Sequence, residues 1–427
     1  MSGATFSDVD TYGLLKELYA DDVEMQDNIV NSFYNKIRKA DSSEVQFDGK
    51  YWNQGVVFQV NESYAAINDD ERLPNASYQK GVFAKYRPKL MYSSIEMTTF
   101  AATRGHKDGR PNGKYLDDTV KGTLLSFMAN LDSDALGNGR GYRATVASAT
   151  PAASSFTVDF STRLRPGAVY DWYNAALTVK RGSIAIPIKA IDRMNRTVYV
   201  DSTFGTGAVP AGATAGDVLV VYGALAAGEP SDGRYMNGYS YLTDNTLAVG
   251  TLSSSTYALW ASTNLNAAGA NPNQEILQQE WDSLWVIAGV PANKAAFNPA
   301  WKRGYLNQFL NQRRFTSNNY DTGASSLSWS PVRMGQDETG KKPANIDMLE
   351  DKNMDPTEFF MWNDSALAVA SDYGDNPHLA DEDGSEFRFR RNYDSINGFF
   401  RFWANTVVKQ RNALGRCYGF TPASGVI

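Results

Sequence analysis

The stretch that decides the fold is GVVFQVNESYAAINDDERLPNASYQKGVFAKYRP, residues 55–88. Both of its ends alternate apolar with polar residues, as β-strands do. Its middle carries a row of four charged residues, 69–72, and reaches a proline two residues later. Two strands of about ten residues would extend roughly 33 Å from their base, at about 3.3 Å per residue. The sequence therefore predicts a long two-stranded extension with a charged tip.

An isolated two-stranded hairpin is marginally stable in water, because one of its faces lacks cover. We expect that face to be covered by another copy of the protein, with apolar burial supplying affinity and the charged tip selecting the register. The alternative is a hairpin folded back on its own domain. The expected contact residues are Val56, Phe58, Val60 and Tyr86 on the apolar face and Asp69, Asp70, Glu71 and Arg72 at the tip.

The composition narrows the class of protein. The chain has 427 residues, enough for two or more structural units, with 42% apolar and 21% charged residues, so an ordinary folded protein is expected. A net charge of -6 argues against a protein that binds nucleic acid by neutralising phosphates. The single cysteine, Cys417, excludes an internal disulfide framework. Neither a signal peptide nor a membrane-spanning run is visible, which favours synthesis in a reducing cytoplasm.

Helical periods occur in five places. Apolar residues recur every four positions in 12–39, and the period fits equally a stripe that docks on a neighbour and ordinary core packing. The clearest helix is 113–136, with one apolar stripe and a glycine at its end. Further helices are expected near 256–267 and 273–287. A fifth follows Asn298, a helix cap, with Pro299 at the first helical position.

Two other regions have the alternation and the composition of β-strands. Residues 140–223 contain about seven short runs rich in valine, isoleucine, threonine and tyrosine, separated by turn residues, including ALTVKRG at 176–182. They predict a small barrel or sandwich inserted into a parent fold. From about 327 onward the chain again reads mostly as strands.

The residues needed for catalysis or metal binding are sparse. His106 and His378 are the two histidines and lie far apart in sequence. GNGRG at 137–141 follows a helix and lacks the lysine of a phosphate loop, so it predicts a joint into the β module. Asp381 and Asp383 before a glycine predict a turn rather than a calcium loop. We predict no enzyme activity, no catalytic residue, no cofactor and no metal.

A basic motif remains. FRFRRN, residues 387–392, places Arg388, Arg390 and Arg391 among aromatic residues. Such interleaving can bind nucleic acid. Because the chain as a whole is acidic, we expect these arginines to pair with acids on another subunit.

The order of these pieces resembles the major capsid proteins of tailed bacteriophages, which have the Hong Kong 97 fold. The likeness covers nearly the whole chain and extends to the texture of LWVIAGVPANKAAFNPAWKRGYLNQFL (284–310), EFFMWNDSALAVAS (358–371) and NALGRCYGF (412–420). It implies an α+β fold with an inserted small β-barrel or sandwich domain. The implied domains are an N-terminal arm and helix (1–50), an E-loop (51–99), a peripheral domain with its spine helix (100–139), the inserted β domain (140–223), an axial domain (224–335) and returning strands of both domains (336–427).

The resemblance implies a coat protein that assembles with itself into hexamers and pentamers of an icosahedral shell around double-stranded DNA, after synthesis in the bacterial cytoplasm. It implies a portal, non-specific contact with packaged DNA, no membrane and, in some relatives, a decoration protein. Because the chain starts almost at the arm, we expect a separate scaffolding protein or assembly without one. The alternatives are an encapsulin-type cellular shell, a carbohydrate-binding or adhesion protein, and a tail or portal component.

Overall fold

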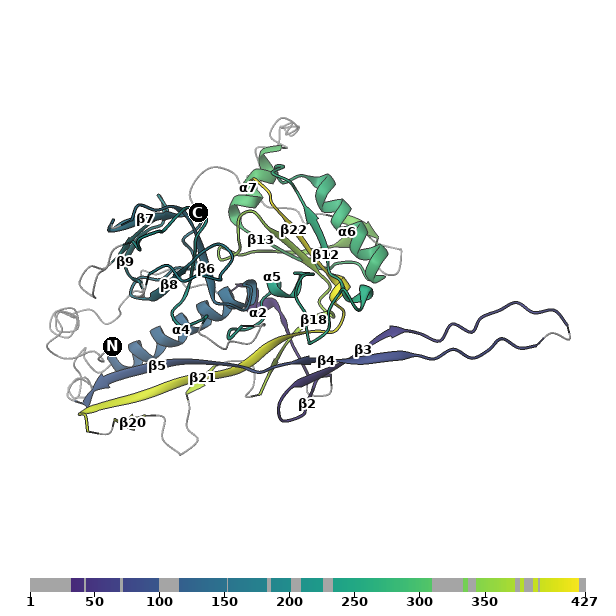
Figure 1. Ribbon diagram of the computed structural model, residues 1–427, viewed down its shortest axis with the longest axis horizontal. Coiled ribbons are helices and arrows are strands. Elements are labelled where there is room, and N and C mark those ends of the chain that lie inside the picture. Colours follow the sequence, from purple (N-terminus) through teal and green to yellow (C-terminus); the bar gives the residue numbers. More distant parts are fainter. Residues whose placement is uncertain are drawn as a thin grey trace, which may run out of the picture. The chain divides into compact units, whose positions relative to one another are not determined.

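The computed structural model divides the chain into two units, of which the smaller comprises Met1–Asn31, Pro88–Asp132 and Ser371–Ala404, and the larger Ser32–Arg87, Ser133–Ala370 and Asn405–Ile427 (Figure 1). The residues that the structure describes are 32–41, 44–69, 72–99, 115–151, 153–182, 186–200, 209–225, 233–308, 333–336, 343–372, 377–379, 387–390 and 392–421.

A helix on a sheet forms the smaller unit. Strand β5 (Lys89–Thr98) pairs antiparallel with β21 (Ser395–Val408), from Thr98↔Ser395 to Lys89↔Ala404. The short strands β19 (His378–Leu379) and β20 (Arg388–Phe389) also pair with β21. Helix α4 (Tyr115–Leu136) matches the prediction at 113–136, and its Val120 and Leu124 pack against the apolar face of the sheet.

A closed barrel occupies much of the larger unit, in the order β10-β7-β6-β11-β8-β9. Val146, Phe156, Trp172 and Leu219 are among the side chains that fill its interior. Six strands of the described residues form the barrel: β6 (Tyr142–Ser148), β7 (Ser155–Val158), β8 (Val169–Tyr173), β9 (Ile186–Asp192), β10 (Thr197–Val200) and β11 (Val218–Val221).

One strand predicted for this region is a turn instead. Residues 174–179 fold around the side chain of Asn174, whose Oδ1 accepts the backbone N–H groups of Thr178 and Val179 at 2.8 and 3.0 Å. Leu177 adopts a positive φ of 56°, which a strand does not allow. The alternation of ALTVKRG was therefore misleading, because the local bonds of an asparagine compete with a sheet ladder.

A mixed sheet lies at the centre of the rest of the larger unit, in the order β12-β22-β17-β13-β16. Helix α6 (Gln274–Ala288) packs against it through Leu277, Trp281 and Leu284. Its strands are β12 (Thr263–Asn266), β13 (Lys294–Phe297), β16 (Asp347–Glu350), β17 (Phe359–Trp362) and β22 (Leu414–Tyr418).

The helix caps in this region follow the sequence. Asn273 accepts the N–H of Ile276 at 2.8 Å, and α6 ends at Gly289 with φ 71°. Helix α7 (Pro299–Gln308) begins after Asn298, whose Oδ1 accepts the N–H of Ala300. Both predicted helices are confirmed.

The prediction of a helix at 256–267 was wrong. A 3-10 turn, η2 (Ala258–Trp260), buries Trp260, and β12 follows it. Strand β12 pairs in parallel with β22, from Thr263↔Gly415 to Asn266↔Tyr418. Pairing with a strand about 150 residues away outweighs local preference here.

Short elements complete the larger unit. Phe33 and Tyr34 of α2 are fully buried, so this part of the predicted 12–39 helix packs in the core. The helix ends at Lys36, and the prediction was wrong for 38–39, which form a short strand instead. Residues 12–31 lie outside the described residues. The remaining elements are α2 (Ser32–Lys36), β1 (Arg38–Lys39), which pairs with β18 (Leu367–Ser371), α5 (Tyr239–Leu242), the pair β14 (Arg333–Gln336) and β15 (Pro343–Asn345), and η4 (Arg411–Ala413).

Candidate functional site

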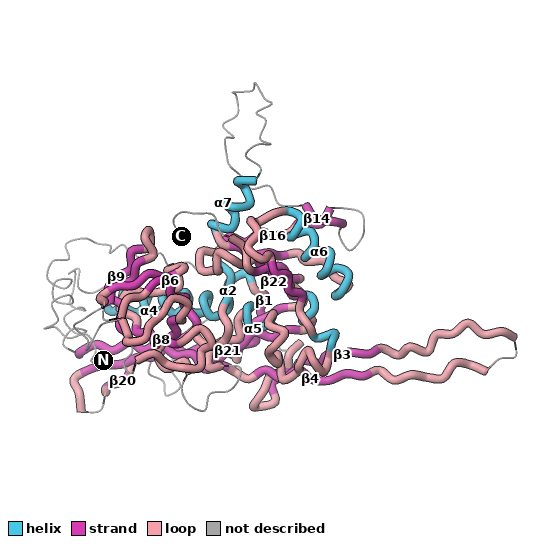
Figure 2. The backbone as a smooth tube through the Cα atoms, turned by 45° about the horizontal axis from the view of Figure 1, so that its top comes forward, coloured by secondary structure: helices cyan, strands magenta, loops and turns pink. Residues whose placement is uncertain are grey.

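The predicted extension is a hairpin of β3 (Trp52–Gln59) and β4 (Lys80–Tyr86), with β2 (Gln46–Phe47) beside β3. Trp52 lies opposite Tyr86, and Val56 lies opposite Val82, as the alternation predicted. Figure 2 shows the two segments beyond the strands running side by side toward the tip. The strand pairing begins at Tyr86, before Pro88, and residues 89–98 pair with β21 instead.

The base of the hairpin is anchored to its own unit. The ring of Phe58 stacks on Tyr257 with centroids 4.6 Å apart and meets Trp260 edge-on at 6.1 Å. Tyr86 is 1% exposed and donates its hydroxyl to the carbonyl of Val408 at 3.1 Å. Burial raises the pKa of this phenol. Phe58 and Tyr86, both expected to contact another subunit, therefore make their contacts within the chain.

The opposite face of the hairpin is open. Val57 is 51% exposed and Phe83 is 63% exposed. Each lies opposite a glycine, Val57 opposite Gly81 and Phe83 opposite Gly55. A Cβ atom on Gly55 would lie 3.8 Å from Cε1 of Phe83, so the ring lies beside bare backbone. These two side chains and two glycines form a flat apolar surface, which we call the Val57–Phe83 face.

Beyond the strands further apolar side chains are exposed. Ser77 donates its backbone N–H to Oδ1 of Asn61 at 3.1 Å, which links the two segments. Asp69 and Arg72 are exposed, whereas Asp70 and Glu71 lie outside the described residues. Such a concentration of exposed apolar groups is typical of an interaction surface. Its members are Val60, Tyr64, Ile67, Leu73 and Tyr78, of which Tyr64 is 95% exposed.

The arginine motif makes contacts inside the smaller unit. Nη1 of Arg390 lies 2.7 Å from Oε1 of Glu96, and its guanidinium lies 4.2 Å from the ring centroid of Tyr393. This pair lowers the pKa of Glu96. Arg388 is exposed on β20, and Arg391 lies outside the described residues. Arg390 thus has an acidic partner within its own chain, which sequence reasoning did not anticipate.

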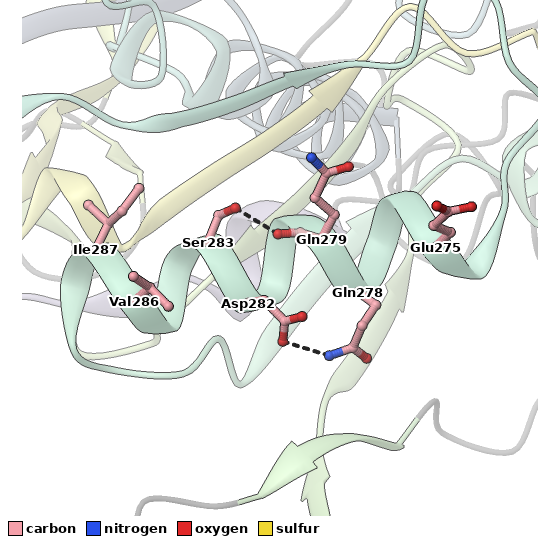
Figure 3. Close-up of a pocket in the computed structure, with 7 residues that line it drawn as sticks. All are labelled: Glu275, Gln278, Gln279, Asp282, Ser283, Val286 and Ile287. Carbon is pink, nitrogen blue, oxygen red and sulfur yellow. Dashed lines mark hydrogen bonds between the residues drawn. The ribbon is translucent and has the colours of Figure 1, made fainter.

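Helix α6 presents a second exposed surface (Figure 3). Glu275, Gln278 and Asp282 lie along it, and Gln278 donates to Asp282 at 2.7 Å. Toward the C-terminal end the surface becomes apolar, with Val286 80% exposed and Ile287 52% exposed. The hollow on this face is shallow and holds no group poised for chemistry.

The sequence offered four other side chains for catalysis or metal binding: His106, His378, Asp381 and Asp383. His378 lies on β19, where its Nε2 is 3.5 Å from Nη2 of Arg401. His106, Asp381 and Asp383 lie outside the described residues. Among the residues that the structure describes, no cluster of histidine, cysteine and acidic side chains could hold a metal ion. Within the same ranges, no helix has both the length and the apolar content needed to cross a membrane.

Comparison with known proteins identifies the fold. Neither a family model nor a curated protein matches the sequence. A chain of the cyanophage A-1(L) capsid asymmetric unit matches with a TM-score of 0.54 and 9% identity, over 94% of this chain and 96% of that one. The chain shares the fold of a phage capsid protein.

Weaker structural likenesses accompany this capsid fold. The capsid of Myoviridae phage XM1 matches at TM-score 0.47 and 7% identity, over 94% of this chain and 95% of that one. The SrpI encapsulin of Synechococcus elongatus matches at TM-score 0.43 and 6% identity, over 98% and 96%.

Proposed function

We propose that this protein is the major capsid protein of a tailed double-stranded DNA bacteriophage and assembles with itself into hexamers and pentamers of an icosahedral shell. One observation carries the proposal: a hairpin fixed at its base leaves the Val57–Phe83 face and the tip uncovered. The capsid fold supports the same reading, because it extends over 94% of the chain. The role is structural rather than enzymatic.

Within this proposal the elements take the roles that the Hong Kong 97 fold assigns. The hairpin is the E-loop, and α4 is the spine helix of a peripheral domain that includes β5 and β21. The sheet with α6 and α7 is the axial domain. The barrel at 142–221 is an inserted domain, which its closed topology supports.

Apolar burial supplies the affinity between copies. Fully burying a valine or phenylalanine side chain contributes about 1.5–3 kcal/mol, whereas an exposed ion pair contributes about 0.2–1 kcal/mol. Val57, Phe83 and the exposed tip residues therefore provide the attraction, while Asp69 and Arg72 select the register. Many modest contacts of this kind add up in a closed shell.

The experiment is negative-stain electron microscopy of the purified, concentrated protein, which should show shells. The double change Val57→Asp and Phe83→Asp should abolish them while the circular dichroism spectrum stays that of the folded chain. The matched control is Val179→Asp, in the turn 174–179 of the barrel region, where Val179 is 53% exposed. This variant should still form shells. Absence of particles from the unaltered protein under all assembly conditions would refute the proposal.

The particle contents separate this function from the encapsulin-type alternative. Particles isolated from the producing cell should contain DNA and not an enzyme cargo. The net charge of -6 favours weak contact between the wall and the packaged DNA. Tight binding of duplex DNA by the free subunit at physiological salt would contradict that expectation. The same assignment implies that the protein acts together with a portal, a separate scaffolding protein and a decoration protein.

A further inference from the structure

A groove lies beside the first strand of the hairpin. Its cavity measures about 280 Å³. The groove is lined by residues 55–58 of β3, by Leu259 and Trp260, and by residues 409–412. Leu259 is 58% exposed, so the groove has apolar surface that a ligand can cover.

The strand pairing shows which backbone groups face this groove. The N–H of Lys85 donates to the carbonyl of Gly250 at 2.8 Å, so the opposed pair Lys85 and Asn53 directs its hydrogen-bonding groups away from the ladder. In an antiparallel ladder every second pair shares that orientation. Gly55 and Val57, which lie opposite Phe83 and Gly81 of β4, therefore also direct their backbone N–H and C=O groups away from β4. Both residues line the groove. Beyond Asn53, no strand of the described residues pairs with this edge of β3, where the carbonyl of Gly55 accepts from Nε2 of its neighbour Gln54 at 3.2 Å.

The charge of the groove is positive. Its lining includes Lys409 and Arg411 and contains no carboxylate. Glu44 accepts from both Lys409 and Arg38, and so balances only part of the local charge. Arg411 is fully buried and donates to the carbonyls of Leu242 and Asp244, while its Nη1 has no hydrogen-bond partner in the described part of the chain. Asp244 also attracts this guanidinium, yet burial still lowers the pKa of Arg411 to about 10, so an anionic neighbour would stabilise its charge.

We propose that this groove binds an extended acidic segment of a second copy of the chain, residues 60–69, by strand addition to the free edge of β3. The inference rests on the proposed role of the hairpin as a contact between copies. Backbone bonds to Gly55 and Val57 would supply affinity, and apolar side chains would cover Leu259. The segment VNESYAAIND carries Glu62 and Asp69 and no basic residue, so its charge complements that of the groove.

Fluorescence anisotropy tests the proposal directly. A labelled peptide of residues 60–69 is titrated with the full chain, at concentrations where the chain sediments as a monomer. Val57→Pro removes an N–H that faces the groove and leaves the bonds to β4 in place, because proline is tolerated at a strand edge. It should weaken binding about tenfold. Val57→Ala keeps the N–H and should stay within about threefold of the unaltered chain.

Charge reversal provides a second, independent arm. Lys409→Glu lies outside the hairpin and should weaken binding of the natural peptide. A peptide with Glu62→Lys and Asp69→Lys should bind Lys409→Glu better than it binds the unaltered chain. Equal affinities across all these variants, or no binding to the unaltered chain, would overturn the groove assignment. If shells form while the peptide fails to bind, this inference alone falls; if the peptide binds but shells never form, the proposed function falls.

Discussion

Gly415 and Glu280 approach so closely that no side chain fits at position 415. A Cβ atom there would overlap Oε1 of Glu280 and lie 2.9 Å from Cδ1 of Leu284. The carboxyl group of Glu280 accepts the backbone N–H of Arg416, and its Oε1 atom has no partner among the described residues. This contact fixes how α6 sits on β22.

Replacing this glycine should therefore destabilise the sheet. We expect Gly415→Ala to lower the free energy of unfolding by about 1–3 kcal/mol, as overpacking of a core does. Urea unfolding followed by circular dichroism measures it. The double change Gly415→Ala and Glu280→Ala should cost less than the sum of the single changes, because the second removes the atom that the first strikes. Strict additivity would show that the two residues do not compete for space.

The same carboxyl group should make stability depend on pH. Burial raises the pKa of Glu280 from its ordinary 4.5 to about 7. Of the groups that face it, Tyr239 on α5 and Cys417 on β22 also have pKa values raised by burial, and the guanidinium of Arg416 is paired with Glu358. Among the residues that the structure describes, no cation therefore compensates the carboxylate of Glu280.

Between about pH 4.5 and about pH 7 the Glu280 carboxyl group keeps its proton in the native state but is ionised in the unfolded state. The free energy of unfolding therefore falls as pH rises through this range. The shift corresponds to about 3 kcal/mol between pH 4.5 and pH 8. Glu280→Gln should remove most of this dependence and be more stable than the unaltered chain at pH 8. Chemical unfolding at pH 5 and pH 8 measures it. Identical pH profiles for both proteins would refute the role of Glu280.

The two faces of the hairpin should respond differently to truncation. Phe58→Ala removes the stack on Tyr257 and should lower stability by about 1–2 kcal/mol. Phe83→Ala should keep the free energy of unfolding within about 0.5 kcal/mol of that of the unaltered chain. It should nevertheless raise the protein concentration at which particles appear. Thermal unfolding and light scattering measure the two effects. A loss of stability from Phe83→Ala instead would mean that its face is already covered.

The cap of α6 offers a local test. Asn273 accepts the N–H of Ile276 at 2.8 Å. Asn273→Ala should lower stability by about 1 kcal/mol, whereas Asn273→Asp should retain most of it. Gln278→Ala, an exposed change on the same helix, serves as the control. Equal effects of the alanine changes would show that the cap contributes nothing specific.

Sequence reasoning located the features whose causes are local. Asn298 and Pro299 determine the start of α7 through their own backbone preferences, and this start was predicted. Helix α6 was predicted by its range, and the structure adds that Asn273 and Gly289 cap it. The alternation around Val56 predicted the strands of the hairpin for the same reason. These elements need no knowledge of the rest of the chain.

The remainder depends on distant partners. Periodicity places Phe58 on one face of a strand but does not say whether that face meets Tyr257 or another copy. The pairing of β12 with β22 likewise joins residues about 150 positions apart, and local propensity favoured a helix instead. The Val57–Phe83 face could have been anticipated from Gly55 and Gly81, because glycines opposite apolar residues leave a flat strand surface.

The stack of Phe58 on Tyr257 has a consequence for how faithfully a large assembly can form. A segment already held in position surrenders little conformational entropy on meeting its partner, so a small contact suffices for reversible association. Each join can then be weak enough for a misplaced subunit to leave before the next arrives. Accuracy in the finished particle would thus originate in a half-buried aromatic contact within each subunit.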